Sequence, residues 1–119
     1  MIDFCSIRRV QTALRRFEQT LRKKTGLTLN EAFSLCTITS GIHEPGQIAR
    51  ELELSPSRLS RVLDTLQEKK LITRTISKED RRNISVSLTE RGTEVVNKYK
   101  TSGIELPKEL MFTQMGTEV

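Results

Sequence analysis

Arginine side chains in two separate segments of the sequence could bind a polyanion. One segment is the charged run Ser-Lys-Glu-Asp-Arg-Arg-Asn at residues 77–83, and the other is residues 55–69. The planar guanidinium group of arginine hydrogen-bonds phosphate and is attracted to the negative potential of a narrow DNA minor groove. Charge by itself leaves a second interpretation open, which is that these side chains form a solvated basic surface. The arginines concerned are Arg58, Arg61, Arg81 and Arg82.

The placement of the charge favours a polyanionic partner. The chain of 119 residues has a formal net charge of +5 and a pI of about 9.6. Residues 55–84 hold eight basic side chains against four acidic ones, and residues 1–30 hold seven against two. Basic charge concentrated in the segment that changes from a helical to a strand-like pattern points towards a polyanion.

Cysteine and histidine form no pattern typical of catalysis or metal binding. Two cysteines are too few for a disulfide scaffold, and with His43 they make no metal-ligand spacing. There is no phosphate-binding glycine loop, and His43 has no acid or nucleophile at a recognisable spacing, so we expect a solvated loop histidine and no enzyme, cofactor or metal. Cys36 is expected to be a small core residue. Cys5 is expected to precede the first helix, where it could act as a thiol sensor.

Two short helices joined by a tight turn are expected to position the arginines of residues 55–69. Pro45 is well placed to start the first helix, and the turn falls at residues 53–54. Ser55 then fits an N-cap with Pro56 at the first helical position, and the second helix continues to about residue 69. This is the helix-turn-helix pattern, with a polar and basic outer face on the second helix. The expected buried stripe of that helix is Leu59, Val62, Leu63 and Leu66.

After residue 71 the pattern changes from a helical period to a period of two. Apolar and polar side chains alternate over residues 72–76 and again over residues 84–88, so residues 77–83 are predicted to be a charged hairpin tip. A helix in the major groove leaves the flanking minor groove within reach of the segment that follows it. The sequence therefore predicts a recognition helix at about residues 55–69 and a wing at about residues 72–88. A hairpin that only packs against its own domain does not explain the charged tip.

Three further helices are predicted. Residues 6–25 place an apolar side chain at every third or fourth position and are ended by Gly26. This narrow stripe fits either pairing with a second copy of the chain or packing on the domain's own core. Thr28 and Glu31 form a capping box for a second helix, and Thr89 can cap a last one. The stripe residues are Ile7, Val10, Leu14, Phe17 and Leu21.

Length and composition predict one domain over residues 1–119. Its nucleic-acid-binding core would lie at about 28–92, and its oligomerisation segments at about 1–27 and 93–119. Hydrophobic residues make up 35% of the chain and aromatic residues 4%, so the core would be modest and a dimer interface would add to it. No long apolar run or secretion leader is visible, so we expect no membrane association and a cytoplasmic location.

Residues 27–92 resemble the multiple-antibiotic-resistance regulator (MarR) family of bacterial winged-helix transcription factors. The most specific part is Asp-Arg-Arg-Asn-Ile-Ser-Val-Ser-Leu-Thr-Glu-Arg-Gly at residues 80–92. The resemblance implies a mainly α fold with a small β-hairpin wing, that is, a winged helix-turn-helix with N- and C-terminal dimerisation helices. The residues that it implies at DNA are Ser55, Ser57, Arg58, Ser60 and Arg61 on the recognition helix and Arg81 and Arg82 on the wing, with Asp80 stabilising the wing loop.

Three features depart from the family pattern. The turn residue is Glu53, where such motifs often have glycine, so either the turn adopts a left-handed backbone at some cost or its geometry differs. The chain after Leu88 is short for a dimerisation segment. No residue signature of a ligand pocket is recognisable, so a small-molecule effector is not identified.

The expected function is sequence-specific binding of double-stranded DNA by a homodimeric transcription regulator. Two recognition helices related by a two-fold axis would fit an inverted repeat. The alternative is a winged-helix module that binds protein or RNA without sequence-specific DNA binding. Strongly salt-dependent, sequence-selective binding to duplex DNA would distinguish the two.

Overall fold

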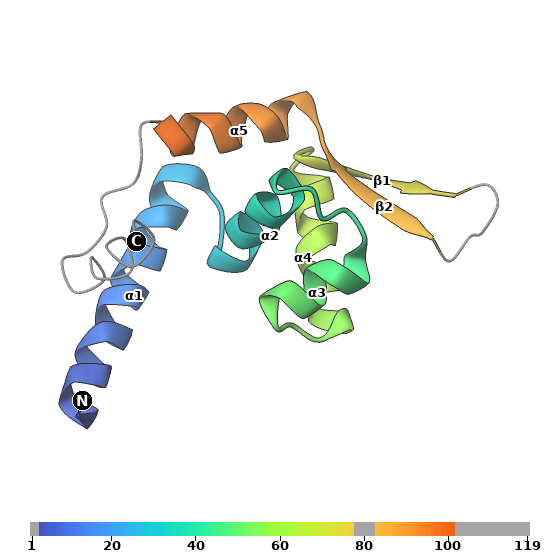
Figure 1. Ribbon diagram of the computed structural model, residues 1–119. Helices are drawn as coiled ribbons and strands as arrows, with labels where there is room; N and C mark the ends of the chain where they lie inside the picture. The colour runs from blue at the N-terminus through green and yellow to red at the C-terminus, as the bar shows by residue number, and fades with distance from the viewer. Residues whose placement is uncertain (1–2, 78–82, 102–119) are drawn as a thin grey trace. The chain divides into compact units, whose positions relative to one another are not determined.

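The computed structural model describes residues 3–77 and 83–101 as helices α1 to α5 and one antiparallel hairpin (Figure 1). The fold class predicted from the sequence is confirmed. The chain divides into two compact units, of which one contains α1 and the other comprises residues 29–103. The elements are α1 (Phe4–Thr25), α2 (Leu29–Thr39), α3 (Pro45–Leu52), α4 (Pro56–Glu68), β1 (Ile72–Ile76), β2 (Ile84–Leu88) and α5 (Glu90–Thr101).

Helix α1 has a cap at each end. The Asp3 carboxylate accepts a hydrogen bond of 2.8 Å from the backbone N–H of Ser6, and this bond holds the pKa of Asp3 below its ordinary value. Because this cap starts the helix at Phe4, the expectation that Cys5 precedes the first helix is wrong, and the exposed Cys5 lies in the first turn. The helix ends at Gly26 as predicted, in a left-handed conformation with φ 75°.

The core of residues 29–103 lies among α2, α3, α4 and the hairpin. The stripe predicted for α4 is confirmed at Leu59, Leu63 and Leu66, which are buried, whereas Val62 is half-buried. Burial of each leucine contributes about 1.5 to 3 kcal/mol, so α4 is fixed along its inner side. The other large apolar side chains that are fully buried in this unit are Leu35, Ile48, Ile72 and Val86.

Helix α2 leaves exposed a cysteine that was expected in the core. Cys36 was predicted to be a small core residue, but its side chain is exposed, and Phe33 on the same side of the helix is 46% exposed. The prediction for Cys36 is therefore wrong. The residues of α2 that are buried are Glu31, Ser34, Leu35, Thr37 and Ile38.

The polar side chains on the buried face of α2 are all hydrogen-bonded. Ser34 Oγ donates to the carbonyl of Asn30 at 2.8 Å, and Thr37 Oγ1 donates to the carbonyl of Phe33 at 2.8 Å. The Glu31 carboxylate accepts hydrogen bonds from a lysine ammonium at the end of α4. A buried polar group costs little when it is paired in this way, and these pairings explain why polar residues take the inward positions.

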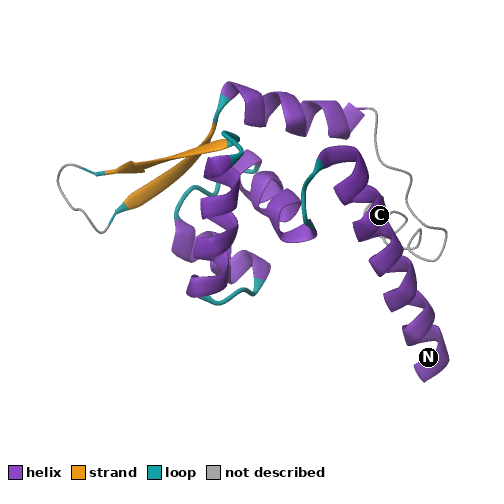
Figure 2. Cartoon of the chain, turned by 180° about the vertical axis from the view of Figure 1, so that it is seen from behind, coloured by secondary structure: helices purple, strands orange, loops and turns teal. Residues whose placement is uncertain are grey.

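The hairpin has the register that the alternating pattern predicts. Strands β1 and β2 pair antiparallel, and the last pair before the tip is Ile76 opposite Ile84. The Ser77 N–H donates to the carbonyl of Asn83 at 2.9 Å, so pairing continues one step further. Within the second unit the hairpin projects away from the helices, as Figure 2 shows. The tip, residues 78–82, lies outside the described residues.

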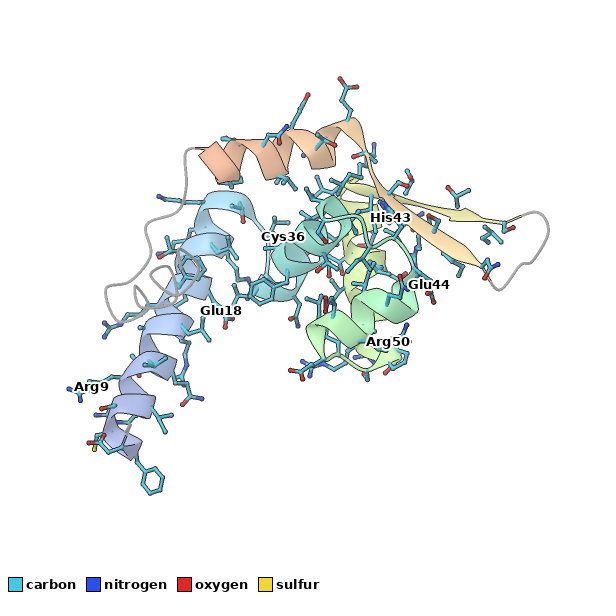
Figure 3. All side chains as sticks on the ribbon, in the orientation of Figure 1. Arg9, Glu18, Cys36, His43, Glu44 and Arg50 are labelled. Carbon is cyan, nitrogen blue, oxygen red and sulfur yellow. The ribbon has the colours of Figure 1, made fainter. Side chains whose placement is uncertain are left out.

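His43 joins the connection between α2 and α3 to the free edge of β2. Its Nδ1 donates to the Val86 carbonyl at 2.9 Å, and the Val86 N–H donates to the His43 carbonyl at 2.8 Å. Figure 3 shows the histidine beside the hairpin. The residue is exposed, as expected for a loop histidine, but its ring has a structural bond. Since a carbonyl can only accept, Nδ1 carries the proton.

The junction between β2 and α5 is tied to the start of β1. Thr89 caps α5 as predicted, because its Oγ1 accepts a bond of 3.0 Å from the Gly92 N–H. The same hydroxyl donates to the Lys70 carbonyl at 2.7 Å, and the Thr89 N–H donates to the Leu71 carbonyl at 3.0 Å. Thr89 and Gly92 of the Leu-Thr-Glu-Arg-Gly motif therefore hold the base of the hairpin against α5.

Candidate nucleic-acid interface

The turn between α3 and α4 adopts the left-handed conformation that the sequence left in question. Glu53 has φ 54° and ψ 42°, a conformation that costs a residue with a side chain about 1 to 2 kcal/mol. The turn is closed by hydrogen bonds from the Glu53 N–H to the Arg50 carbonyl at 3.2 Å and from the Leu54 N–H to the Ala49 carbonyl at 2.9 Å. Of the two alternatives, the strained backbone is the one the chain adopts.

The first two turns of α4 present a polar and basic face. Ser55 Oγ accepts a bond of 3.2 Å from the Arg58 N–H, as predicted for the N-cap, and Pro56 occupies the first helical position. Since the core leucines lie on the inner side of α4, the opposite side is left for a partner. The exposed polar residues there are Ser57, Arg58, Ser60 and Arg61.

Arg74 of β1 binds α4, a contact that the sequence analysis did not anticipate. Its guanidinium donates from Nε to Gln67 Oε1 at 2.7 Å and from a terminal nitrogen to Asp64 Oδ1. Asp64 could instead have paired with an arginine of its own helix. Among the described residues neither Arg58 nor Arg61 forms an ion pair, so their charges are not neutralised by Asp64.

The contact with Arg74 fixes the hairpin to α4. Arg74 shares the inward face of β1 with the buried Ile72, whereas Ile76 on that face is 56% exposed. The sequence carried one signal for this contact: Arg74 occupies an inward position of the alternating pattern, where an unpaired charge would be costly. Beyond Arg74, Ile84 of β2 is half-buried, and the predicted wing residues Asp80, Arg81 and Arg82 lie outside the described residues.

A small cavity lies between α3, α4 and the hairpin. It has a volume of about 150 Å³ and is bordered by Pro45, Ala49, Leu59 and Arg74, among others. Pockets for drug-sized ligands usually measure about 300 to 1,000 Å³. The cavity is therefore smaller than the usual pocket for a drug-sized ligand, and it gives no indication of an effector.

No metal site or membrane span emerges from the described residues. Within residues 3–77 and 83–101, no three His, Cys, Asp or Glu side chains are grouped so that they could hold a metal ion. In the same ranges no helix has both the length and the apolar character needed to cross a bilayer.

Helices α3 and α4, the turn at Glu53 and the hairpin after α4 define a winged helix-turn-helix. Residues 27–84 match the MarR family. A second match covers more of the chain: the uncharacterized HTH-type transcriptional regulator YpoP of Bacillus subtilis is 34% identical over 103 residues, which are 81% of this chain and 73% of that protein. The chain belongs to the MarR family, and the resemblance noted in its sequence is confirmed.

A further relative is the HTH-type transcriptional repressor MdtR of Bacillus subtilis. It is 37% identical over 71 residues, which are 59% of this chain and 46% of MdtR. The match thus spans about half the length of MdtR. The chain has the winged-helix fold of this family.

Solved structures of the family have the same fold. The S. aureus MepR–DNA complex has a TM-score of 0.70 with 18% identity, covering 100% of this chain and 86% of MepR. A cysteine-to-serine mutant of E. coli MarR has a TM-score of 0.73 with 24% identity, covering 95% of this chain and 85% of that one. A cysteine-to-serine mutant of Lactococcus lactis ZitR has a TM-score of 0.61 with 27% identity, covering 80% of this chain and 64% of that one.

Proposed function

We propose that the chain is a transcription regulator of the MarR type that binds specific double-stranded DNA, with α4 in the major groove and the hairpin at the minor groove. The observation that carries the proposal is the outer face of α4. That helix is anchored by three buried leucines, and Arg58 and Arg61 on its exposed side have no ion-pair partner among the described residues. The repressor MdtR and the DNA complex of MepR support it.

The proposal assigns different roles to the two groups of basic residues. Arginine can bond the O6 and N7 atoms of guanine in the major groove, which is the commonest specific contact, and this is the role proposed for Arg58 and Arg61, with Ser55, Ser57 and Ser60 beside them. Arg81 and Arg82 are proposed to meet the backbone and minor groove, with Asp80 stabilising the loop. The regulator would act in the cytoplasm with its DNA, and we assign it no enzymatic activity.

Single alanine variants should separate these two roles. Loss of Arg58 or Arg61 should weaken binding to the specific site by about 1 to 3 kcal/mol and change non-specific binding much less. Loss of Arg81 or Arg82 should weaken binding to every duplex by a similar factor and reduce the salt slope by about 0.9 per lost phosphate contact. The measurement is the affinity of each variant, at several salt concentrations, for a random duplex and for a site selected from a random DNA pool.

The control for that experiment is Arg91→Ala, which removes one exposed positive charge from α5. It should leave both affinities near those of the unchanged protein. If no variant alters DNA binding, the DNA-binding proposal is wrong, and selective binding to RNA would favour the alternative module. If the wing variants lose only specificity while the α4 variants lose only salt dependence, the two roles are reversed.

We further propose that the chain is a homodimer, paired through α1 together with the segment after Thr89. Ile7 is 52% and Leu14 39% exposed in the single chain, Val10 and Phe17 are half-buried, and Leu21 is buried. Two of the five stripe residues are therefore exposed and available to a second copy. DNA sites should then be inverted repeats with half-sites roughly 10 base pairs apart. Sedimentation at micromolar concentration should give a dimer, and a clean monomer would contradict both expectations.

A further inference from the structure

Helix α1 carries basic side chains in two rows along one side. Residues seven apart in an α-helix are almost in line, and neighbouring residues are about 100° apart, so two such rows form one continuous strip. All six side chains of the strip are exposed. The first row is Arg8, Arg15 and Arg22, and the second row is Arg9, Arg16 and Lys23.

The strip lies on the side of α1 opposite its apolar stripe and contains no acidic residue. Glu18 is the acidic side chain of α1; it is half-buried, and Figure 3 shows it projecting from a different side of the helix than Arg9. Among the described residues none of the six basic side chains forms an ion pair. Arg9 donates to Ser6 Oγ at 3.3 Å, which leaves its charge uncompensated.

We propose that this strip is a second DNA-contacting surface, which binds the phosphate backbone of a duplex without reading its sequence. Successive members of each row are about 10.5 Å apart along the helix, so each row spans about 21 Å. Duplex DNA presents one negative charge per about 1.7 Å of its axis, which gives about 12 phosphates over that length. None of these charges forms an ion pair among the described residues, so a polyanion along the strip would compensate them.

The inference extends the proposed function, which uses residues 29–103, to a surface in the other compact unit. An anionic membrane is the competing polyanion. Helices that lie in a membrane interface usually combine a wide apolar face with Trp, Phe or Leu, whereas the apolar side of α1 is a narrow stripe and the chain has no Trp. Both partners are anionic, so the narrow apolar stripe is the feature that favours DNA over a membrane.

The test compares full-length chains carrying three changes in the first row. The variant R8Q/R15Q/R22Q removes three charges, and R8K/R15K/R22K keeps them; helix propensity changes little because Arg, Lys and Gln are similar. Binding to a random-sequence duplex is measured by fluorescence anisotropy over a range of salt concentrations. We expect the glutamine variant to reduce the slope of log affinity against log salt by about 0.9 per lost contact, or about 2.7 in all, and the lysine variant to restore it.

Two further arms distinguish the outcomes. The variant R58A/R61A in α4 should lose preference for the selected site while keeping most of its random-duplex binding through α1. If that variant keeps its site preference, the proposed function fails and the α1 surface stands. An unchanged salt slope in the glutamine variant overturns the α1 surface and leaves the proposed function intact. The unchanged protein is also tested for binding to phosphatidylserine vesicles. If the glutamine changes abolish vesicle binding but leave duplex binding unaffected, the strip binds a membrane and the proposed DNA contact is wrong.

Discussion

Replacing Gly92 with alanine should lower the free energy of unfolding by about 3 kcal/mol, at the upper end of the usual cost of overpacking. A Cβ at this position would lie 2.1 Å from the carbonyl oxygen of Leu71 and 3.1 Å from its carbonyl carbon. Both are backbone atoms at the start of the hairpin, and the same carbonyl already accepts the Thr89 N–H. The clash can therefore be relieved only by moving β1 or α5.

The matched control is Gly46→Ala in α3. A Cβ there would meet Glu44 Oε1 at 2.8 Å, but this atom is the end of a flexible side chain and can move away. Alanine also favours a helix over glycine by up to about 1 kcal/mol, so this variant should be neutral or slightly stabilised. Urea unfolding of both variants provides the measurement. Equal stabilities would mean that the backbone does not pack as closely at Gly92 as the structure indicates.

The sequence predicted those elements whose ends are marked by local chemistry. Pro56 follows the capping Ser55, Gly26 ends α1, and Thr89 caps α5, and each acts within a few residues of its own position. The hairpin register could be predicted for a similar reason, because a period of two fixes which side chains face inward. Local signals of this kind can be recognised without knowing which surface the helix or strand packs against.

Apart from the start of α1, where the local cap at Asp3 was missed, the errors and omissions concern contacts between distant parts of the chain. Cys36 was assigned to the core because its neighbours are apolar, but the buried face of α2 is set by partners on other elements. The pairing of Arg74 with Asp64 joins residues ten positions apart, and that of Glu31 with Lys69 joins residues 38 apart. Propensity and periodicity do not specify which distant charge compensates which, because that choice depends on three-dimensional packing.

In the candidate site, too, the features set by local sequence were predictable and those set by distant contacts were not. The exposed positions on α4 were predictable, since a helix with a leucine stripe must place the remaining side chains elsewhere. The wing assignments Asp80, Arg81 and Arg82 remain predictions of the sequence and the family resemblance. The sequence did not show whether Arg58 or Arg61 pairs with Asp64. In the structure Asp64 pairs with Arg74, which lies on the strand that follows the helix.

Lys69, the C-cap of α4, should be the basic residue whose loss destabilises the fold most, because it leaves a buried carboxylate unpaired. Its ammonium donates to both carboxylate oxygens of Glu31, at 2.8 and 3.0 Å. The Glu31 side chain is 4% exposed and that of Lys69 is 35% exposed. The carboxylate therefore has little access to water and depends on its protein partners, whereas the ammonium is still partly hydrated.

The substitution Lys69→Met should lower the free energy of unfolding by about 3 kcal/mol, the lower end of the range for removing one partner of a buried ion pair, because Lys69 is partly exposed. The double variant E31Q/K69M should recover most of this loss. Glutamine retains hydrogen-bonding groups at the start of α2 and carries no charge that must be desolvated. Urea unfolding of both single variants, the double variant and the unchanged protein forms a double-mutant cycle.

The cycle also bears on DNA binding, because the pair joins the C-terminal end of α4 to the first turn of α2. In K69M the end of the recognition helix loses its charged anchor, whereas Arg58 and Arg61 at its beginning remain supported by Leu59 and Leu63. Affinity for a selected site should therefore fall less than stability does, as long as the chain remains folded. If the double variant is as unstable as K69M, the unpaired charge on Glu31 is not the cause of the lost stability. The loss would then reflect the packing of the lysine side chain.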